Sequence, residues 1–275
     1  MVSRRVVSII ILASTATVAN ADNHDTGSLV NVTSAEEVEW GYLNPLRGVL
    51  SPGAADLWGD RTSGSATGML VRFKKGFESP PHIHNITYRG VVIEGMMHND
   101  DPSAAKMWMP PGSFWTQPAG EDHTTAANGE TNLIYLEIDS GPYLVQPSDE
   151  QFDNGERPLN LHADNVVWLK KSDLHTIKAD NVQVTHVWGS TADMGGSMIK
   201  LGAGFEGELL TDASEFRAVV IGGEVSYDAR DLEEPKILKA GSYLESIGHY
   251  THHLANSGDG EVTLYIRTNT RYSVQ

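Results

Sequence analysis

From Val38 onward the chain alternates short apolar runs with glycine, proline, asparagine and aspartate. Runs such as Val91-Val92-Ile93 have the length and β-branched content of a buried strand. No long stretch repeats its apolar positions at the helical period of 3.6 residues. Many short strands separated by turn residues are typical of β sandwiches and barrels, so the pattern predicts an all-β fold.

The chain also repeats itself, which predicts two barrels of similar length. Five pairs of short segments recur in the same order and at a nearly constant separation. They are Trp58-Gly59 with Trp188-Gly189, Gly68 to Val71 with Ser197 to Lys200, Gly76 to Glu78 with Gly204 to Glu206, Tyr88 to Ile93 with Phe216 to Ile221, and Gly112 to Phe114 with Gly241 to Tyr243. A polar, proline-containing segment near residues 146–161 is typical of a linker. We therefore predict a first barrel over residues 36–155 and a second over 156–275.

The candidate chemistry begins with the His-x-His pair formed by His82 and His84. Side chains on a strand repeat every second residue, so both imidazoles would leave the same face. Pro80 and Pro81 remove two backbone donors just before the pair, which favours the start or the edge of a strand. Two histidines hold a metal poorly, and the best further donor is His123. The alternative is three unrelated polar residues in a β protein.

At these residues the chain resembles the cupin superfamily, whose first motif is G-x5-H-x-H-x3or4-E-x6-G and whose second is G-x5-P-x-G-x2-H-x3-N. The first motif is matched by Gly76, His82, His84, Tyr88 and Gly95, and the second by Gly112, Pro118, Gly120 and His123, with Asn128 one residue late. The fragment Tyr88-Arg89-Gly90-Val91-Val92 is similar to a bicupin group of largely unassigned function. The resemblance implies two tandem jelly-roll barrels, with a divalent metal held by His82, His84 and His123.

Tyr88 stands where the family usually has a metal-binding glutamate. A tyrosine side chain ordinarily has a pKa of about 10 and is neutral, whereas glutamate binds as an anion. Three neutral histidines would leave the metal a stronger Lewis acid with open positions for a substrate, dioxygen or water. Such a site resembles three-histidine iron cupins that cleave diketones or thiols. Tyr88 itself is a candidate catalytic residue, as a ligand or as a general acid or base, and packing is the alternative.

The second copy has lost this pattern. Leu210 and Asp212 stand in register with the His-x-His pair, and Phe216 stands in register with Tyr88. Only His252 keeps its place. We therefore expect the second barrel to be degenerate as a metal site.

Residues 1–21 resemble a secretory signal peptide. Arg4 and Arg5 precede a short apolar run, and Ala19-Asn20-Ala21 supplies the small residues of a cleavage site. We expect a periplasmic or secreted protein whose mature N-terminus, residues 22–35, is flexible. The alternative for the apolar run is a buried first strand.

The composition limits both the binding partners of the protein and the side chains that could bind a metal. The net charge of −16 argues against nucleic acid and anionic membranes. The absence of cysteine excludes thiolate metal sites and leaves histidine, carboxylate, tyrosine or water.

The function most consistent with these features is a metal-dependent, oxygenase-type enzyme acting on a small organic molecule. Fe(II) is favoured, with Zn, Ni or Mn as alternatives, because imidazole affinity alone does not choose among them. A non-redox isomerase or lyase is one alternative function, and a non-catalytic module that binds a small molecule or a metal is another. The resemblance also implies a possible homodimer, because cupins often pair into dimers.

Overall fold

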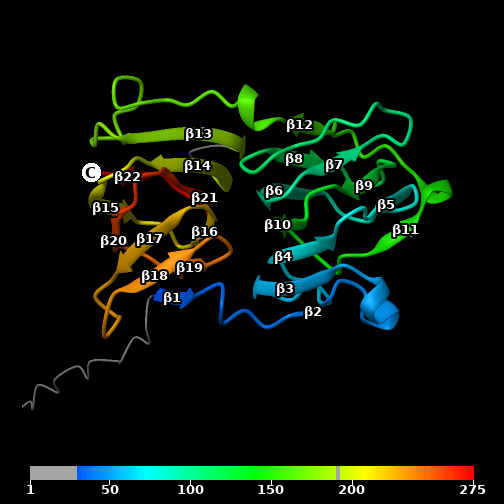
Figure 1. Cartoon of the computed structure of the whole chain (residues 1–275), viewed down its shortest axis with the longest axis horizontal. Coiled ribbons are helices and arrows are strands. Elements are labelled where there is room, and N and C mark those ends of the chain that lie inside the picture. Colours follow the sequence, from blue (N-terminus) through cyan, green and yellow to red (C-terminus); the bar gives the residue numbers. More distant parts are fainter. Residues whose placement is uncertain (1–29, 190–192) are drawn as a thin grey trace, which may run out of the picture.

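The computed structural model describes residues 30–189 and 193–275, and it has two β barrels side by side (Figure 1). Apart from three short 3-10 helices, every regular element in these two ranges is a strand, so the all-β prediction is confirmed. The 3-10 helices are η1 (Pro45–Leu50), η2 (Ser148–Glu150) and η3 (Ala163–Asn165). In residues 30–189 and 193–275 no helix is long and apolar enough to cross a membrane. The predicted signal peptide lies outside the described residues.

The first barrel is built on a seven-stranded sheet with two small sheets opposite it. The large sheet has the order β12 (Leu159–Leu161), β8 (Phe114–Gln117), β6 (Tyr88–Glu94), β10 (Thr131–Ile138), β4 (Thr67–Lys74), β3 (Gly53–Trp58) and β2 (Gly41–Tyr42). The small sheets pair β11 (Val145–Pro147) with β5 (His82–His84), and β7 (Met97–Asp100) with β9 (Thr124–Ala127).

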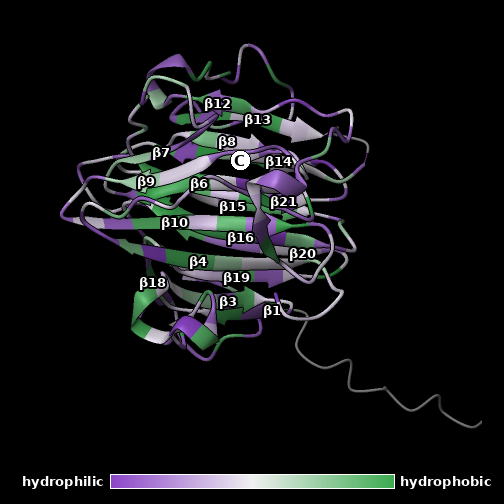
Figure 2. Ribbon diagram, turned by 90° about the vertical axis from the view of Figure 1, so that its right-hand side faces the viewer, coloured by the Kyte–Doolittle hydropathy of each residue, from purple (hydrophilic) through white to green (hydrophobic). Residues whose placement is uncertain are grey.

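The second barrel is built on a six-stranded and a five-stranded sheet. The larger has the order β1 (Val30–Thr33), β19 (Tyr243–Ser246), β16 (Phe216–Gly222), β21 (Val262–Thr268), β14 (Gly195–Leu201) and β13 (Val182–Gly189). The smaller has the order β18 (Lys236–Lys239), β17 (Glu224–Asp228), β20 (Tyr250–Ala255), β15 (Glu206–Thr211) and β22 (Tyr272–Val274). Side chains from both sheets form one core. In the molecule as a whole, hydrophobic segments lie on the strands of both barrels, and hydrophilic segments lie both in loops and on strands (Figure 2).

Each barrel receives an edge strand from the segment that precedes the other barrel. β1, which precedes the first barrel, pairs with β19 of the second, and β12, which precedes the second, pairs with β8 of the first. The prediction of a flexible segment over residues 22–35 is therefore wrong for residues 30–33, and residues 22–29 lie outside the described residues. Polarity alone suggested flexibility, but a partner edge near the other end of the chain orders this strand. The division between residues 155 and 156 stays a prediction.

The two large sheets face each other across a shared apolar layer. Its members come from both barrels, and among them are Trp58 and Tyr135 of the first and Tyr265 of the second. Trp58 donates to the Tyr135 hydroxyl over 3.1 Å, and Trp188 donates to the Tyr265 hydroxyl over 2.6 Å. These two pairs occupy matching positions of the repeat, although an origin by duplication stays a prediction.

Cations from each barrel cover a tryptophan of the other. The Arg217 guanidinium carbon lies 3.9 Å from the centre of the Trp58 ring, and that of Arg89 lies 3.6 Å from the centre of the Trp188 ring. Cation–π contacts of this kind contribute about 0.5–2 kcal/mol each, depending on how far they are desolvated. The two barrels therefore pack through specific contacts as well as through apolar area.

A single buried carboxylate, Glu137, lies at the centre of this interface. It accepts hydrogen bonds from the Tyr265 hydroxyl over 2.8 Å and the Tyr135 hydroxyl over 3.1 Å, and it lies 3.4 Å from the Arg267 guanidinium. Asp139 and Glu215 hold the same guanidinium, at 2.7 and 3.1 Å. A charge buried this completely stabilises the fold only while all of these partners are present.

Replacing Glu137 by Gln should lower the free energy of unfolding by about 3 kcal/mol, because Arg267 loses a buried counter-charge. Urea unfolding followed by circular dichroism would measure the change. Glu130→Gln is the matched control, since Glu130 forms an exposed pair with Lys75 and should change stability by less than about 1 kcal/mol. Equal stability of the two variants would contradict a central role for Glu137.

Candidate metal centre

Backbone pairing on both sides of β5 fixes the positions of the three histidines. On one side β5 pairs with β11, with Val145 opposite His84. On the other side the backbones of His82 and His123 exchange two hydrogen bonds of 3.0 Å each. His123 is therefore held directly opposite His82.

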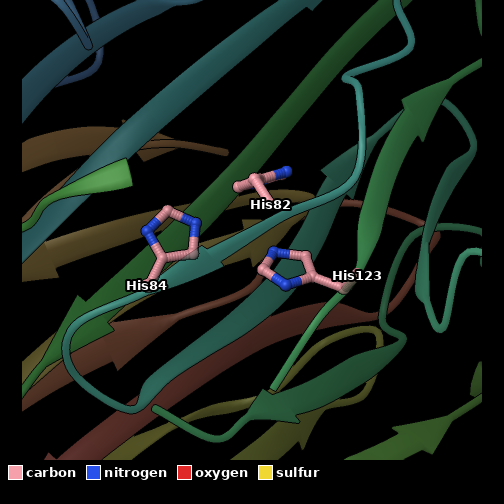
Figure 3. A group of neighbouring side chains, drawn as sticks. All are labelled: His82, His84 and His123. Carbon is pink, nitrogen blue, oxygen red and sulfur yellow. The ribbon is translucent and has the colours of Figure 1, made fainter. Parts of the chain in front are cut away.

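The three rings converge inside the first barrel (Figure 3). One ring nitrogen from each of His82, His84 and His123 lies within 4.8 Å of the other two. The ring centroids of His82 and His123 are 4.2 Å apart, and the centroid of His84 is 5.1 and 5.2 Å from these two. Small ring rotations bring such nitrogens onto metal–nitrogen bonds of about 2 Å. The structure thus brings together all three predicted ligands.

Backbone carbonyls set the tautomer of each ring. The Nδ1 atoms of His82, His84 and His123 lie 2.9, 3.0 and 3.1 Å from the carbonyl oxygens of Pro80, Leu144 and Glu121. A carbonyl oxygen only accepts, so each Nδ1 carries the proton and each Nε2 keeps its lone pair. This is the arrangement that orients histidine ligands toward a metal. The donor set therefore fits a divalent ion on chemical grounds.

Burial keeps the three imidazoles neutral. His82, His84 and His123 are 8, 2 and 0% exposed. Desolvation lowers the pKa of His82, and desolvation together with the other two rings lowers that of His84 well below its usual value. Burial, with a smaller effect of His82, lowers the pKa of His123 to about 3. Near neutral pH all three rings keep their lone pairs, and the ligands contribute no negative charge.

Tyr88 lies beside this cluster with its hydroxyl in a polar network. The hydroxyl donates to Asn99 Oδ1 over 2.9 Å and lies 3.3 Å from His123 Nε2. Asn99 in turn donates to Gln117 Oε1 over 2.8 Å, and Gln117 donates to the Glu121 carbonyl, which also accepts from His123 Nδ1. Burial raises the Tyr88 pKa, so the phenol is neutral. The network places the Tyr88 oxygen toward the ligand nitrogens.

A second phenol, from Tyr143, was missed by the sequence reasoning. Its ring stacks on His84 with centroids 4.3 Å apart, and its hydroxyl lies 3.1 Å from His84 Nε2. Because His84 Nδ1 carries the ring proton, Nε2 accepts and the Tyr143 hydroxyl donates. Tyr143 precedes β11, outside both motifs, so no spacing rule identifies it. The one available signal is Tyr272, which occupies the matching position of the second copy.

The second barrel has no comparable cluster among its described residues. His252 is buried, and both of its ring nitrogens contact hydroxyls, of Tyr227 at 2.8 Å and of Ser246 at 3.0 Å. Asp212 is exposed and pairs instead with His249. Among residues 30–189 and 193–275, the first-barrel histidines are the one group of three potential ligands close enough to share an ion.

Comparisons with known proteins identify one family and a set of similar folds. Residues 31–275 match a family described as "Domain of unknown function (DUF4437)". No curated protein matches the chain.

Three solved structures are similar over most of this chain. A "putative dioxygenase" from Nostoc punctiforme has a TM-score of 0.67 at 14% identity, with 88% of this chain and 82% of that chain covered. Oxalate decarboxylase from Lactobacillus farciminis, as a formate complex, has a TM-score of 0.58 at 13% identity, with 91% and 90% covered. Salicylate 1,2-dioxygenase from Pseudoaminobacter salicylatoxidans, as an adduct with gentisate, has a TM-score of 0.55 at 13% identity, with 81% and 77% covered. At these identities the likeness concerns the fold.

Acid should destabilise the metal-free protein partly through His252, whose pKa is lowered to about 3 by burial and, to a smaller degree, by His253. Below the unfolded pKa of about 6.5 the unfolded chain binds a proton that the folded chain excludes, so stability falls as pH falls from 6.5 toward 3. His252→Gln should reduce this slope by up to about 1.4 kcal/mol per pH unit. Chemical unfolding at pH 5 to 8 in EDTA measures the slope.

The slopes of the two proteins should coincide between pH 7 and pH 8, where the imidazole is neutral in both the folded and the unfolded chain. If stability changes with pH equally in the parent protein and in His252→Gln between pH 5 and pH 6, His252 does not contribute to the acid destabilisation.

Proposed function

Because the chain belongs to the DUF4437 family, whose description assigns no activity, we propose its function from its own residues: a mononuclear metalloenzyme of the oxygenase type that acts on a small organic substrate. His82, His84 and His123 would hold the ion, with Fe(II) favoured. The observation that supports this most directly is the common orientation of the three rings, with every Nδ1 bonded to a carbonyl and every Nε2 left with its lone pair. Purely structural histidines need no such shared orientation.

The neutral donor set favours an anionic, chelating substrate. His82, His84 and His123 would hold the ion without adding negative charge, so a bound Fe(II) would supply Lewis acidity and redox capacity. A diketone enolate or a phenolate with a neighbouring oxygen would neutralise the positive charge of the ion. A dioxygenase reaction places both atoms of dioxygen in the product and needs no external reductant.

Two phenols would then act on the bound substrate. Tyr88 donates its proton to Asn99 and presents its oxygen lone pairs toward the cluster, so it can hold or accept a hydrogen bond there. Tyr143 covers His84, and its side chain must give up the bond to Nε2 when that nitrogen binds an ion. Both rings also exclude water from a site whose histidines are already buried.

Iron-loaded protein should consume dioxygen with a diketone, thiol or phenolic substrate, and His123→Ala should lower both bound iron and the rate by more than about tenfold. An oxygen electrode and elemental analysis measure the two quantities. Oxygen consumption absent across the whole panel, with one iron bound per chain, would overturn the oxygenase proposal.

Turnover with Zn or Ni under anaerobic conditions would select instead a non-redox isomerase or lyase. Metal binding with no turnover under any condition would select a non-catalytic binding module.

Tyr143→Phe should strengthen metal binding about fivefold, because it removes a hydrogen bond of about 1 kcal/mol that competes for His84 Nε2. Competition with a chromophoric chelator measures the affinity. Tyr88→Phe is the matched control, because the Tyr88 hydroxyl donates its hydrogen bond to Asn99 and does not compete for a ligand nitrogen. The metal affinity of this variant should stay unchanged, while its turnover should fall about a hundredfold. If Tyr143→Phe instead binds the metal about fivefold more weakly than the parent protein, the Tyr143 phenol itself binds the ion.

We also propose that the protein is exported. The basic, apolar and small-residue order of residues 1–21 supports this proposal.

A further inference from the structure

A cavity of about 400 Å³ opens in the second barrel, apart from the three histidines. It lies between strands β13, β14, β21 and β22 and the segment 173–177. Its volume falls within the range of about 300–1,000 Å³ that is usual for small-molecule sites. Tyr272, the counterpart of Tyr143 in the repeat, is part of its wall. The second barrel thus has a cavity beside Tyr272, and Leu210, Asp212 and His252, which stand in register with the three histidines, are not part of its lining.

The wall of this second-barrel cavity is fixed by backbone hydrogen bonds. Val274 donates to the Thr176 carbonyl over 2.9 Å, and Lys178 donates to the Val274 carbonyl over 2.8 Å. These bonds attach the segment 173–177 to β22. On the adjoining side, the strands β13 and β14 pair from Val182 to Gly189, with one irregularity in register between His186 and Trp188. The cavity is therefore largely preformed, and a ligand would not have to pay for ordering it.

The interior is apolar with a few hydroxyl groups. Ile177 and Val184 are both buried and line it. Ser197 and Tyr272 are also buried, and their hydroxyl oxygens lie 2.8 Å apart in a hydrogen bond. A site of this composition suits a ligand with an apolar, ring-sized body and one or two polar atoms.

The lining also carries exposed basic side chains: Arg271, His175 and His186. In the part of the chain that the structure describes, none of the three has a hydrogen-bond or ion-pair partner for its side chain. The one acidic residue of the lining, Asp173, is already engaged by the backbone N–H of Lys170 and the hydroxyl of Ser172. Arg271 is thus an available fixed cation in a protein of net charge −16. A guanidinium pairs especially well with a carboxylate.

From the cavity and its basic rim we propose that the second barrel binds a small carboxylate with an aromatic or cyclic body, without a metal. The ring lies against Ile177, Val184 and Tyr272, and the carboxylate meets Arg271. This site is independent of the three histidines. The second barrel, which lacks the three histidines, would in this way bind a carboxylate that is a substrate, a product or an effector of the protein.

Calorimetric titration of the full-length protein with 2-naphthoate, in EDTA to keep it metal-free, tests the proposal. We expect one site per chain, with affinity at least about tenfold weaker in Arg271→Gln, since the bond to a charged partner is lost. The neutral isostere 2-naphthamide should bind the parent protein more weakly by a similar factor. Arg47→Gln is the matched control, because Arg47 is also exposed but lies on η1 of the first barrel.

A second variant separates this site from the candidate metal centre. His82→Ala/His84→Ala should bind 2-naphthoate like the parent protein, whereas Arg271→Glu should abolish binding. Loss of binding in the histidine variant, unchanged binding in both Arg271 variants, or no binding at millimolar naphthoate would each overturn the proposal. Because naphthoate binding is measured on metal-free protein, its failure does not bear on the oxygenase proposal.

Discussion

The candidate metal centre depends on backbone pairing around the short strand β5. This strand is too short to be stable alone, and it is held between β11 on one side and the backbone of His123 on the other. The same segments supply the Leu144 and Glu121 carbonyls that fix the ring tautomers of His84 and His123. The hydrogen bonds that build the strand pairing and those that orient the rings therefore come from the same few residues. Distortion of one set disturbs the other, which ties the chemistry of the site to the integrity of the barrel.

The interface between the barrels combines a shared apolar layer with one buried cluster of charged and hydroxyl groups around Glu137. Tyr135 and Tyr265 occupy matching positions of the repeat and make matching contacts with a tryptophan. Glu137 and Arg267 also occupy matching positions, but they carry opposite charges and meet each other. Complementary charges at matched positions favour the pairing of one barrel with the other over the pairing of like barrels. The two halves are thus adapted to a single arrangement within one chain.

Much of the fold and of the site was accessible from the sequence because both rest on local spacing. Alternation and turn residues predict strands, and the His-x-His spacing places His82 and His84 on one face. Tyr143 was missed because its place over His84 is set by the path of the chain after β10, which no periodicity encodes. The order of β1 is not predictable from its own residues, because the strand edge with which it pairs is far away in the sequence. The second-barrel cavity could not be predicted either, since it depends on how the segment 173–177 attaches to β22.

The exchange of edge strands between the barrels determines when during synthesis the chain can complete its folding. Val30 is opposite Ser246, so a residue synthesised early finds its place only after almost the whole chain has emerged. Contacts of such high sequence separation are costly in loop entropy and form slowly. A chain of this kind stays incompletely folded through most of its translation, and either half made alone would present an unpaired sheet edge that invites association. Pairing of the two ends of the chain is therefore among the last steps in the folding of this molecule.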